Sequence, residues 1–129
     1  MKLLVDTHVF LWMATAPERL GGAREAVETP ANEVLLSAVS TWELAIKVSI
    51  GRLALPEAVG GYVTSRMRSL ALDGLPVEHV HAAAVEALPM HHRDPFDRLL
   101  IAQARTVGAT LVTADEAVRP YDIPILWAR

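Results

Sequence analysis

Four acidic residues recur at equivalent places along this 129-residue sequence. Each one follows a short apolar stretch that is typical of a β-strand, or lies in the first turn of the helix expected next: Asp6, Glu43, Asp97 and Asp115. Each has a local explanation as a helix cap, and Ser40-Thr41-Trp42-Glu43 has the pattern of a capping box. Capping explains the acids one by one, but it does not explain their repetition at the ends of successive strands.

Short apolar stretches alternate with amphipathic ones along the chain. Strands are predicted over residues 3–5, 34–36, 72–75, 110–113 and 124–127, and helices over residues 9–14, 17–28, 40–50, 56–70, 77–88 and 95–105. Gly21 and Gly22 weaken the second helix, and Gly51 lies where the third helix should end. Strands separated by helices predict an α/β fold with a parallel sheet covered on both faces.

In such a sheet, the carboxyl ends of the strands line one edge, and this edge is where the fold binds ligands. Carboxylates gathered there repel one another, and their ionised forms become stable when hard cations lie between them. Oxygen ligands alone favour Mg²⁺ or Mn²⁺. The four acids therefore predict a metal site suited to hydrolysis of phosphodiester bonds.

The composition narrows the classes of site. A net charge of −3 provides no general attraction for a polyanion, which must meet a local basic patch or bound metal ions. The absence of cysteine excludes disulfides, thiolate nucleophiles and cysteine-based zinc sites. The adjacent His91 and His92 match no common zinc spacing. His79 and His81 could share a strand face, but they lie at the start of a helical pattern, so we predict solvated surface histidines for both pairs. No apolar run reaches the ~20 residues that span a bilayer, and a cytoplasmic protein without a membrane segment is expected.

Four segments resemble, in their order and spacing, the signatures of the VapC toxins, which are PIN-domain ribonucleases of type II toxin–antitoxin systems. These segments are LVDTH (residues 4–8), SAVSTWEL (37–44), HRDPFDRLLIAQA (92–104) and LVTAD (111–115). The resemblance extends over nearly the whole chain. It implies a single PIN-like domain over residues 1–129, in which a central, mainly parallel twisted sheet lies between helices in three layers. It also implies a metal-dependent endoribonuclease that uses Mg²⁺ or Mn²⁺.

The resemblance assigns roles to particular acids. Asp6, Glu43 and Asp97 match the central metal-binding and catalytic acids of the family, and Asp115 matches a more variable fourth acid. Asp94 is ambiguous. Since it directly precedes Pro95, it is placed to cap a helix, and we expect its carboxylate to bind backbone N–H groups behind the metal ligands. The hydroxyl of Thr113 is expected to assist the site.

Basic residues near the acidic edge are candidates for contacts with phosphates. They are Lys47, Arg52, Arg93 and Arg98, of which Arg93 and Arg98 are the best candidates, with ordinary surface charge as the alternative. His8 departs from the family pattern, because many VapC toxins have asparagine beside the first acid. Its role stays open at this stage.

The resemblance also implies partners: an RNA substrate, a cognate VapB-like antitoxin whose C-terminal segment lies across the toxin, and a second copy in a homodimer. Nothing in the sequence specifies which RNA is cleaved. The alternative hypothesis is a non-catalytic PIN-like module that binds RNA or protein. The presence of all four acids argues against that alternative.

Overall fold

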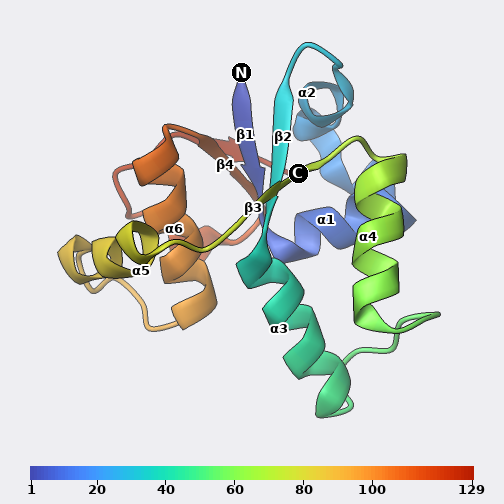
Figure 1. Ribbon diagram of the computed structural model, residues 1–129. Coiled ribbons are helices and arrows are strands. Elements are labelled where there is room, and N and C mark those ends of the chain that lie inside the picture. Colours follow the sequence, from blue (N-terminus) through green and yellow to red (C-terminus); the bar gives the residue numbers. More distant parts are fainter.

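The computed structural model describes all 129 residues. At its centre lies a sheet of five parallel strands in the order β3-β2-β1-β4-β5, which confirms the predicted α/β architecture (Figure 1). The strands are β1 (Lys2–Val5), β2 (Glu33–Ser37), β3 (Asp73–Leu75), β4 (Thr110–Thr113) and β5 (Ile125–Trp127). Leu4 of the central strand pairs with Leu35 on one side and with Leu111 on the other.

The strand order reverses beside β1. The chain builds β2 and β3 outward on one side of β1, then crosses to build β4 and β5 on the other side. In sheets of this kind, the segments that follow the two strands at the reversal open a crevice between them, and ligands bind there. Asp6 follows β1 and Asp115 follows β4, so the topology brings both acids to this crevice.

Helices cover both faces of the sheet (Figure 1). One face carries α1 (Thr7–Thr15), α2 (Arg24–Glu28) and α4 (Val59–Ser69), and the other carries α5 (His79–Ala84) and α6 (Pro95–Val107). The remaining helix, α3 (Ala38–Ser49), extends from the carboxyl end of β2. This arrangement is the three-layer architecture that the resemblance implies.

Alternation along β1 explains why there are two apolar clusters. Leu3 and Val5 point to the first face, where they belong to one cluster with Phe10 of α1. Leu4 points to the opposite face and belongs to a second cluster with Ile101 of α6. Because all three strand residues are fully buried, β1 is held from both sides and fixes the position of the acid that follows it.

The start of α3 differs from the prediction. The helix begins at Ala38, directly after β2, since the hydroxyl of Ser37 at the end of that strand accepts the N–H of Val39 and caps the helix. The predicted capping box beginning at Ser40 is therefore wrong. Ser40 lies inside the helix, fully buried, and its hydroxyl is 2.9 Å from the hydroxyl of Thr7.

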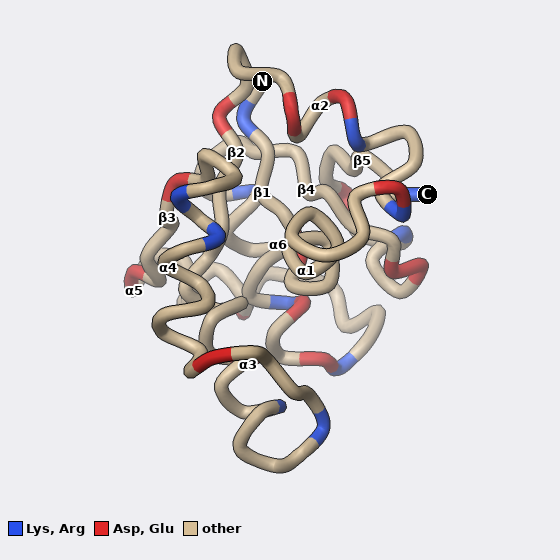
Figure 2. The backbone as a smooth tube through the Cα atoms, turned by 90° about the vertical axis from the view of Figure 1, so that its right-hand side faces the viewer, with Lys and Arg blue, Asp and Glu red and all other residues tan.

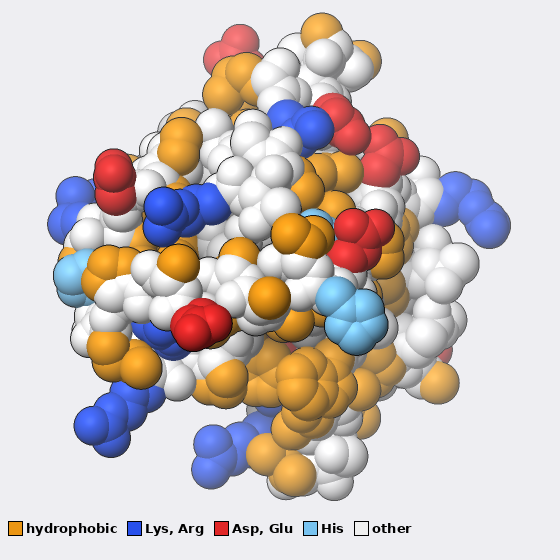
Figure 3. Space-filling model, turned by 60° about the vertical axis from the view of Figure 1, so that its left-hand side comes forward, with side chains coloured by type: hydrophobic (Ala, Val, Ile, Leu, Met, Phe, Trp, Pro, Cys, Tyr) orange, Lys and Arg blue, Asp and Glu red, His pale blue; other side chains and the backbone are white.

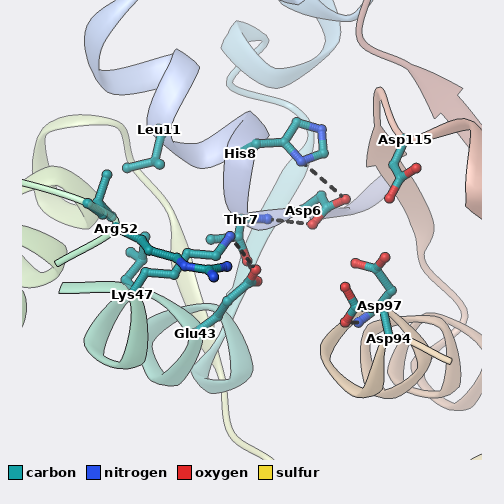
Figure 4. A pocket seen from close by; sticks show the side chains of 12 residues that line it. Asp6, Thr7, His8, Leu11, Glu43, Lys47, Arg52, Asp94, Asp97 and Asp115 are labelled. Atoms are coloured by element: carbon teal, nitrogen blue, oxygen red, sulfur yellow. Dashed lines mark hydrogen bonds and ion pairs between the residues drawn. The ribbon is translucent and has the colours of Figure 1, made fainter. Parts of the chain in front are cut away.

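The end of α3 confirms the role predicted for Gly51. This residue has a φ of 76° and donates its N–H to the carbonyl of Val48, while Arg52 donates to the carbonyl of Lys47. These two bonds form a Schellman motif, which requires the left-handed conformation that glycine adopts without strain. The turn directs Arg52 back beside Lys47 at the carboxyl edge of the sheet (Figure 4).

Two other predicted helices are divided. The predicted second helix consists of a 3₁₀ helix over Pro17–Ala23 and the short α2, with a break at Gly21, where φ is 50°. The helix predicted before Pro89 ends where expected, but only α5 is α-helical, and a 3₁₀ turn follows over Val85–Ala87.

None of the helices is both long enough and apolar enough to cross a lipid bilayer. Lys and Arg residues are interspersed with Asp and Glu residues along the backbone (Figure 2). A local arrangement of charge, and not an overall field, must therefore determine where a polyanion binds.

Candidate active site

A pocket of about 320 Å³ opens at the carboxyl edge of the sheet (Figure 4). Five acidic residues line it: Asp6 from the end of β1, Glu43 from α3, Asp94 and Asp97 from the start of α6, and Asp115 after β4. Residues from four separate segments of the sequence are thus brought together at the topological switch point. This is the convergence that the spacing of the acids predicts.

Asp6 is held rigidly at the base of the pocket, with only 3% of its surface exposed. Its Oδ1 accepts the N–H of Thr7 at 2.7 Å, and its Oδ2 accepts the hydroxyl of Thr113 at 2.7 Å. Thr113 in turn accepts the N–H of Asp115 at 3.1 Å. The hydroxyl of Thr113 therefore connects the ends of β1 and β4 and orients the Asp6 carboxylate.

His8 lies beside the same carboxylate. Its Nδ1 is 3.5 Å from Oδ2 of Asp6, and its Nε2 accepts the N–H of Ala114 at 3.1 Å. A ring nitrogen that accepts this bond must carry a lone pair, so the proton of the neutral ring resides on Nδ1, toward Asp6. Where the sequence left its role open, the structure places His8 between the first acid and the end of β4.

Glu43 reaches the pocket from the second turn of α3. Its Oε1 accepts the hydroxyl of Thr7 at 2.7 Å, and its Oε2 is 2.8 Å from Nζ of Lys47, one turn further along the helix. Thr7 follows Asp6 directly and is 4% exposed, so its backbone and its hydroxyl each hold one acid. Nothing in the sequence distinguishes this threonine from an ordinary first residue of a helix.

Asp94 and Asp97 occupy different positions at the start of α6. Oδ1 of Asp94 accepts the N–H groups of Phe96 at 2.9 Å and of Asp97 at 3.2 Å, as a helix cap does. The capping role predicted for Asp94 is therefore confirmed. The Asp97 carboxylate makes no such bond to the helix and lies on the side of α6 that faces Asp6 and Asp115 (Figure 4).

The electrostatics of the pocket disfavour the ionised forms of Asp6 and Asp97. Burial, together with the neighbouring carboxylates of Asp6, Asp94 and Asp115, raises the pKa of Asp97 to about 8. Burial also raises the pKa of Asp6, although His8 and the hydrogen bond from Thr113 oppose that shift. Acids whose charge is this unfavourable without a counter-ion are the ones that a bound cation stabilises.

The donor set fits a hard divalent cation. No group of three or more histidine, cysteine or acidic side chains is arranged so that it could hold a metal ion by itself. Mg²⁺ seldom uses such a cage in proteins, since it keeps several water ligands and binds through one or two carboxylates. An open pocket with several carboxylates in its lining matches this preference.

The basic residues are distributed differently from the prediction. Lys47 and Arg52 line the acidic pocket. Arg98 is buried, and its guanidinium donates to the carbonyls of Pro89 at 2.8 Å and Leu88 at 3.3 Å, so it holds the segment before α6 in place instead of facing the pocket. We therefore leave Arg98 out of the proposed phosphate contacts.

Arg93 lies outside the acidic pocket, on a separate apolar groove. This groove is lined mainly by Trp42, Met90 and Leu99, of which Trp42 is 57% and Met90 72% exposed. Figure 3 shows hydrophobic side chains gathered on the side of the molecule that carries α5 and α6. Arg93 and Asp94 are neighbours in the sequence, but Asp94 lines the acidic pocket and Arg93 lines the apolar groove.

Two histidines are less solvated than predicted. His81 is 3% exposed, and its Nδ1 accepts the N–H of Glu78 at 3.1 Å, so the prediction of a surface position is wrong for it. The prediction is also wrong for His92, because its Nε2 lies 3.2 Å from Oδ2 of Asp97 and its side chain is 16% exposed. The closeness of His92 to Asp97 in the sequence, five residues apart, is the one local indication of this contact.

Comparison with known proteins agrees with this geometry. The sequence model of the PIN domain matches residues 3–123. The chain belongs to the PIN-domain family. Among curated PIN-domain relatives, Ribonuclease VapC22 of Mycobacterium tuberculosis is 31% identical over 122 residues, which cover 95% of this chain and 93% of VapC22. Ribonuclease VapC16 of the same organism is 40% identical over 68 residues, 53% of this chain and about half the length (48%) of VapC16.

Solved structures share the PIN-domain fold. The crystal structure of VapBC2 from Rickettsia felis bound to a DNA fragment from its promoter superposes with a TM-score of 0.73 over 100% of both chains, at 14% identity. The structure of FitAB bound to a DNA fragment superposes with a TM-score of 0.68 at 21% identity, over 98% of this chain and 94% of that one. At these identities the likeness concerns the fold, and the PIN-like fold predicted from the sequence is confirmed.

Proposed function

We propose that this PIN-domain protein is a metal-dependent endoribonuclease that hydrolyses RNA phosphodiester bonds and acts as the toxin of a VapBC-type toxin–antitoxin pair. The observation that carries the proposal is the pocket at the switch point, where the pKa of Asp97 is raised to about 8 by burial and by neighbouring carboxylates. Two relatives bear the name ribonuclease, which supports RNA as the substrate.

The residues of the pocket have different proposed roles. Asp6 and Asp97 are the proposed central metal ligands, with Glu43 and Asp115 completing the acidic set. When bound, Mg²⁺ or Mn²⁺ supplies an activated water and neutralises charge on the phosphate. Thr113 orients Asp6 by its hydrogen bond.

On the opposite side of the pocket, Lys47 and Arg52 are placed to bind phosphate oxygens (Figure 4). Contacts of this kind position a nucleic-acid backbone without reading its bases. These contacts therefore do not decide which RNA is cleaved, and the choice of RNA must depend on other features, such as the shape of the RNA. Arg93 lines the separate apolar groove and not this pocket, so we propose no phosphate contact for it.

Two protein partners belong to the proposal. A VapB-like antitoxin is supported by the structural neighbours, which were solved as VapBC and FitAB assemblies. A second copy of the chain in a homodimer is proposed from the family resemblance. The exposed apolar groove around Trp42 and Met90 is the kind of surface that a protein partner covers. The alternative, a PIN-like module that binds without cleaving, would have no use for carboxylates held at an unfavourable charge.

The test compares cleavage of RNA by the wild type, Asp6→Asn and Asp73→Asn, each with Mg²⁺, with Mn²⁺ and with EDTA. Asp73 is an exposed acid of β3 and serves as the matched control. We expect EDTA to abolish cleavage, Asp6→Asn to lose most of it, and Asp73→Asn to retain it. If EDTA or Asp6→Asn leaves cleavage unchanged, metal catalysis at this pocket is wrong and the binding module becomes the better account.

A further inference from the structure

A chain of polar side chains runs behind Asp97, away from the opening of the pocket. Nη1 of Arg98 donates to the hydroxyl of Tyr121 at 2.8 Å. The same hydroxyl lies 2.8 Å from Nδ1 of His92, and Nε2 of His92 lies 3.2 Å from Oδ2 of Asp97. Arg98 is 6% and Tyr121 4% exposed, so water contributes little to these contacts.

The direction of each hydrogen bond follows from the chemistry of the groups. A guanidinium has donors only, so Tyr121 accepts from Arg98 and its single hydroxyl proton is available for His92. Nδ1 of His92 must then be the acceptor, and the ring proton resides on Nε2, facing the Asp97 carboxylate. When Asp97 is ionised, the opposite tautomer would direct a lone pair at its carboxylate, and it would leave the Tyr121 proton without an acceptor.

His92 is the only nitrogen-bearing side chain within hydrogen-bond distance of the Asp97 carboxylate. The acids that surround it, Asp6, Asp94 and Asp115, all repel its charge. The other central acids have different supports, because Thr113 orients Asp6 and Thr7 with Lys47 orients Glu43. The support of Asp97 comes from outside the pocket.

We propose that His92 is a positioning residue for Asp97, fixed as the Nε2–H tautomer by Tyr121 and Arg98, so that one carboxylate oxygen is held by the ring while the other stays available to a metal ion. This inference rests on the proposed metal-binding role of Asp97. It assigns a role to three residues that lie outside the acidic pocket and explains why Arg98 is buried. Hydrogen bonds to ligating carboxylates of this kind tune metal affinity.

The first experiment reads the tautomer directly. Long-range ¹H–¹⁵N correlation spectra of the metal-free wild type, recorded above pH 8 so that Asp97 is ionised, distinguish the two neutral forms of a histidine ring. We expect the Nε2–H form for His92. The Nδ1–H form would overturn the inference, whatever the protein does with metal ions.

The second experiment measures Mn²⁺ binding by calorimetry. His92→Leu should weaken Mn²⁺ binding at least tenfold, within the roughly 10–100-fold range typical of lost partners of metal ligands. His92→Gln, which keeps an amide N–H donor, should recover most of the affinity. Tyr121→Phe removes only the hydroxyl and should weaken binding by less than His92→Leu. His79→Gln, at an exposed histidine, is the matched control and should bind as the wild type does.

Kinetics and folding separate positioning from a structural role. Each variant is first checked by its thermal unfolding, and cleavage by folded His92 variants should lose kcat with little change in KM for RNA. Wild-type Mn²⁺ affinity in His92→Leu would refute the positioning role. If the wild type binds no Mn²⁺ while His92 is the Nε2–H tautomer, the proposed function fails and the hydrogen-bonded chain stands.

Discussion

In the metal-free protein, the Asp97 carboxyl keeps its proton up to a pH of about 8, whereas its ordinary pKa is 3.8. Between these values the unfolded chain is ionised at this position and the folded chain is not, so folding must take up a proton. At pH 7.5 this uptake lowers the free energy of unfolding by up to about 5 kcal/mol, since each pKa unit corresponds to about 1.36 kcal/mol. Water entering the open pocket solvates the carboxylate and reduces that figure.

Asp97→Asn removes this penalty and keeps nearly the same shape. We therefore expect the metal-free variant to be more stable than the wild type at pH 7.5, by between about 1 and about 5 kcal/mol. Because the folded pKa is raised, the penalty is absent below pH 3.8, grows as the pH rises, and is complete above about pH 8. The advantage of the variant should therefore be larger at pH 8 than at pH 5.

Urea unfolding in EDTA, followed by tryptophan fluorescence at several pH values, measures this difference. Asp73→Asn is the control and should change stability little, because that acid is exposed. Addition of Mg²⁺ should stabilise the wild type and should leave Asp97→Asn nearly unchanged, since a ligand stabilises only the state that binds it. A metal-free variant that is less stable than the wild type at pH 8, or an advantage independent of pH, would refute the reasoning.

Three further outcomes follow from the same geometry. Asp94→Ala should lower the free energy of unfolding by about 1 kcal/mol, as loss of a helix cap does, and leave measurable cleavage; loss of all cleavage with unchanged stability would contradict this. Lys47→Gln and Arg52→Gln should each weaken RNA binding, which filter binding measures at several salt concentrations. Each variant should also reduce the magnitude of the slope of log affinity against log salt concentration by about 0.7–0.9, because one phosphate contact is lost. Because a proton competes with the metal at Asp97, Mn²⁺ affinity should rise by up to about tenfold per pH unit and level off above about pH 8, and calorimetry in buffers of different ionisation enthalpy should detect the released proton.

Much of the fold and part of the site follow from the sequence. The alternation of apolar runs with amphipathic stretches predicts the parallel sheet, because strands separated by helices can pair only through crossovers. Asp6 and Asp115 follow strands, and Glu43 and Asp97 lie near the starts of helices, which places the four acids at the carboxyl edge. Asp94 is predictable as a cap because a proline follows it, and Gly51 because a Schellman turn needs a positive φ.

Other features required the tertiary structure. Short-range pattern misplaces the start of α3, because Ser37 and Ser40 are equally good caps in sequence and only the end of β2 decides between them. The sequence also favours Arg98 as a phosphate contact. The residues around Arg98 in the sequence do not reveal that its guanidinium is buried and donates to the carbonyls of Pro89 and Leu88.

The sequence by itself determines which acids lie at the edge of the sheet, because strand direction and helix caps are local properties. The tertiary structure alone determines how those acids are held. The contact between Thr113 and Asp6 joins residues 107 positions apart, and that between Tyr121 and His92 joins residues 29 positions apart. Such contacts leave no periodicity in the sequence, since each depends on the packing of two elements whose relative placement is set by the whole sheet.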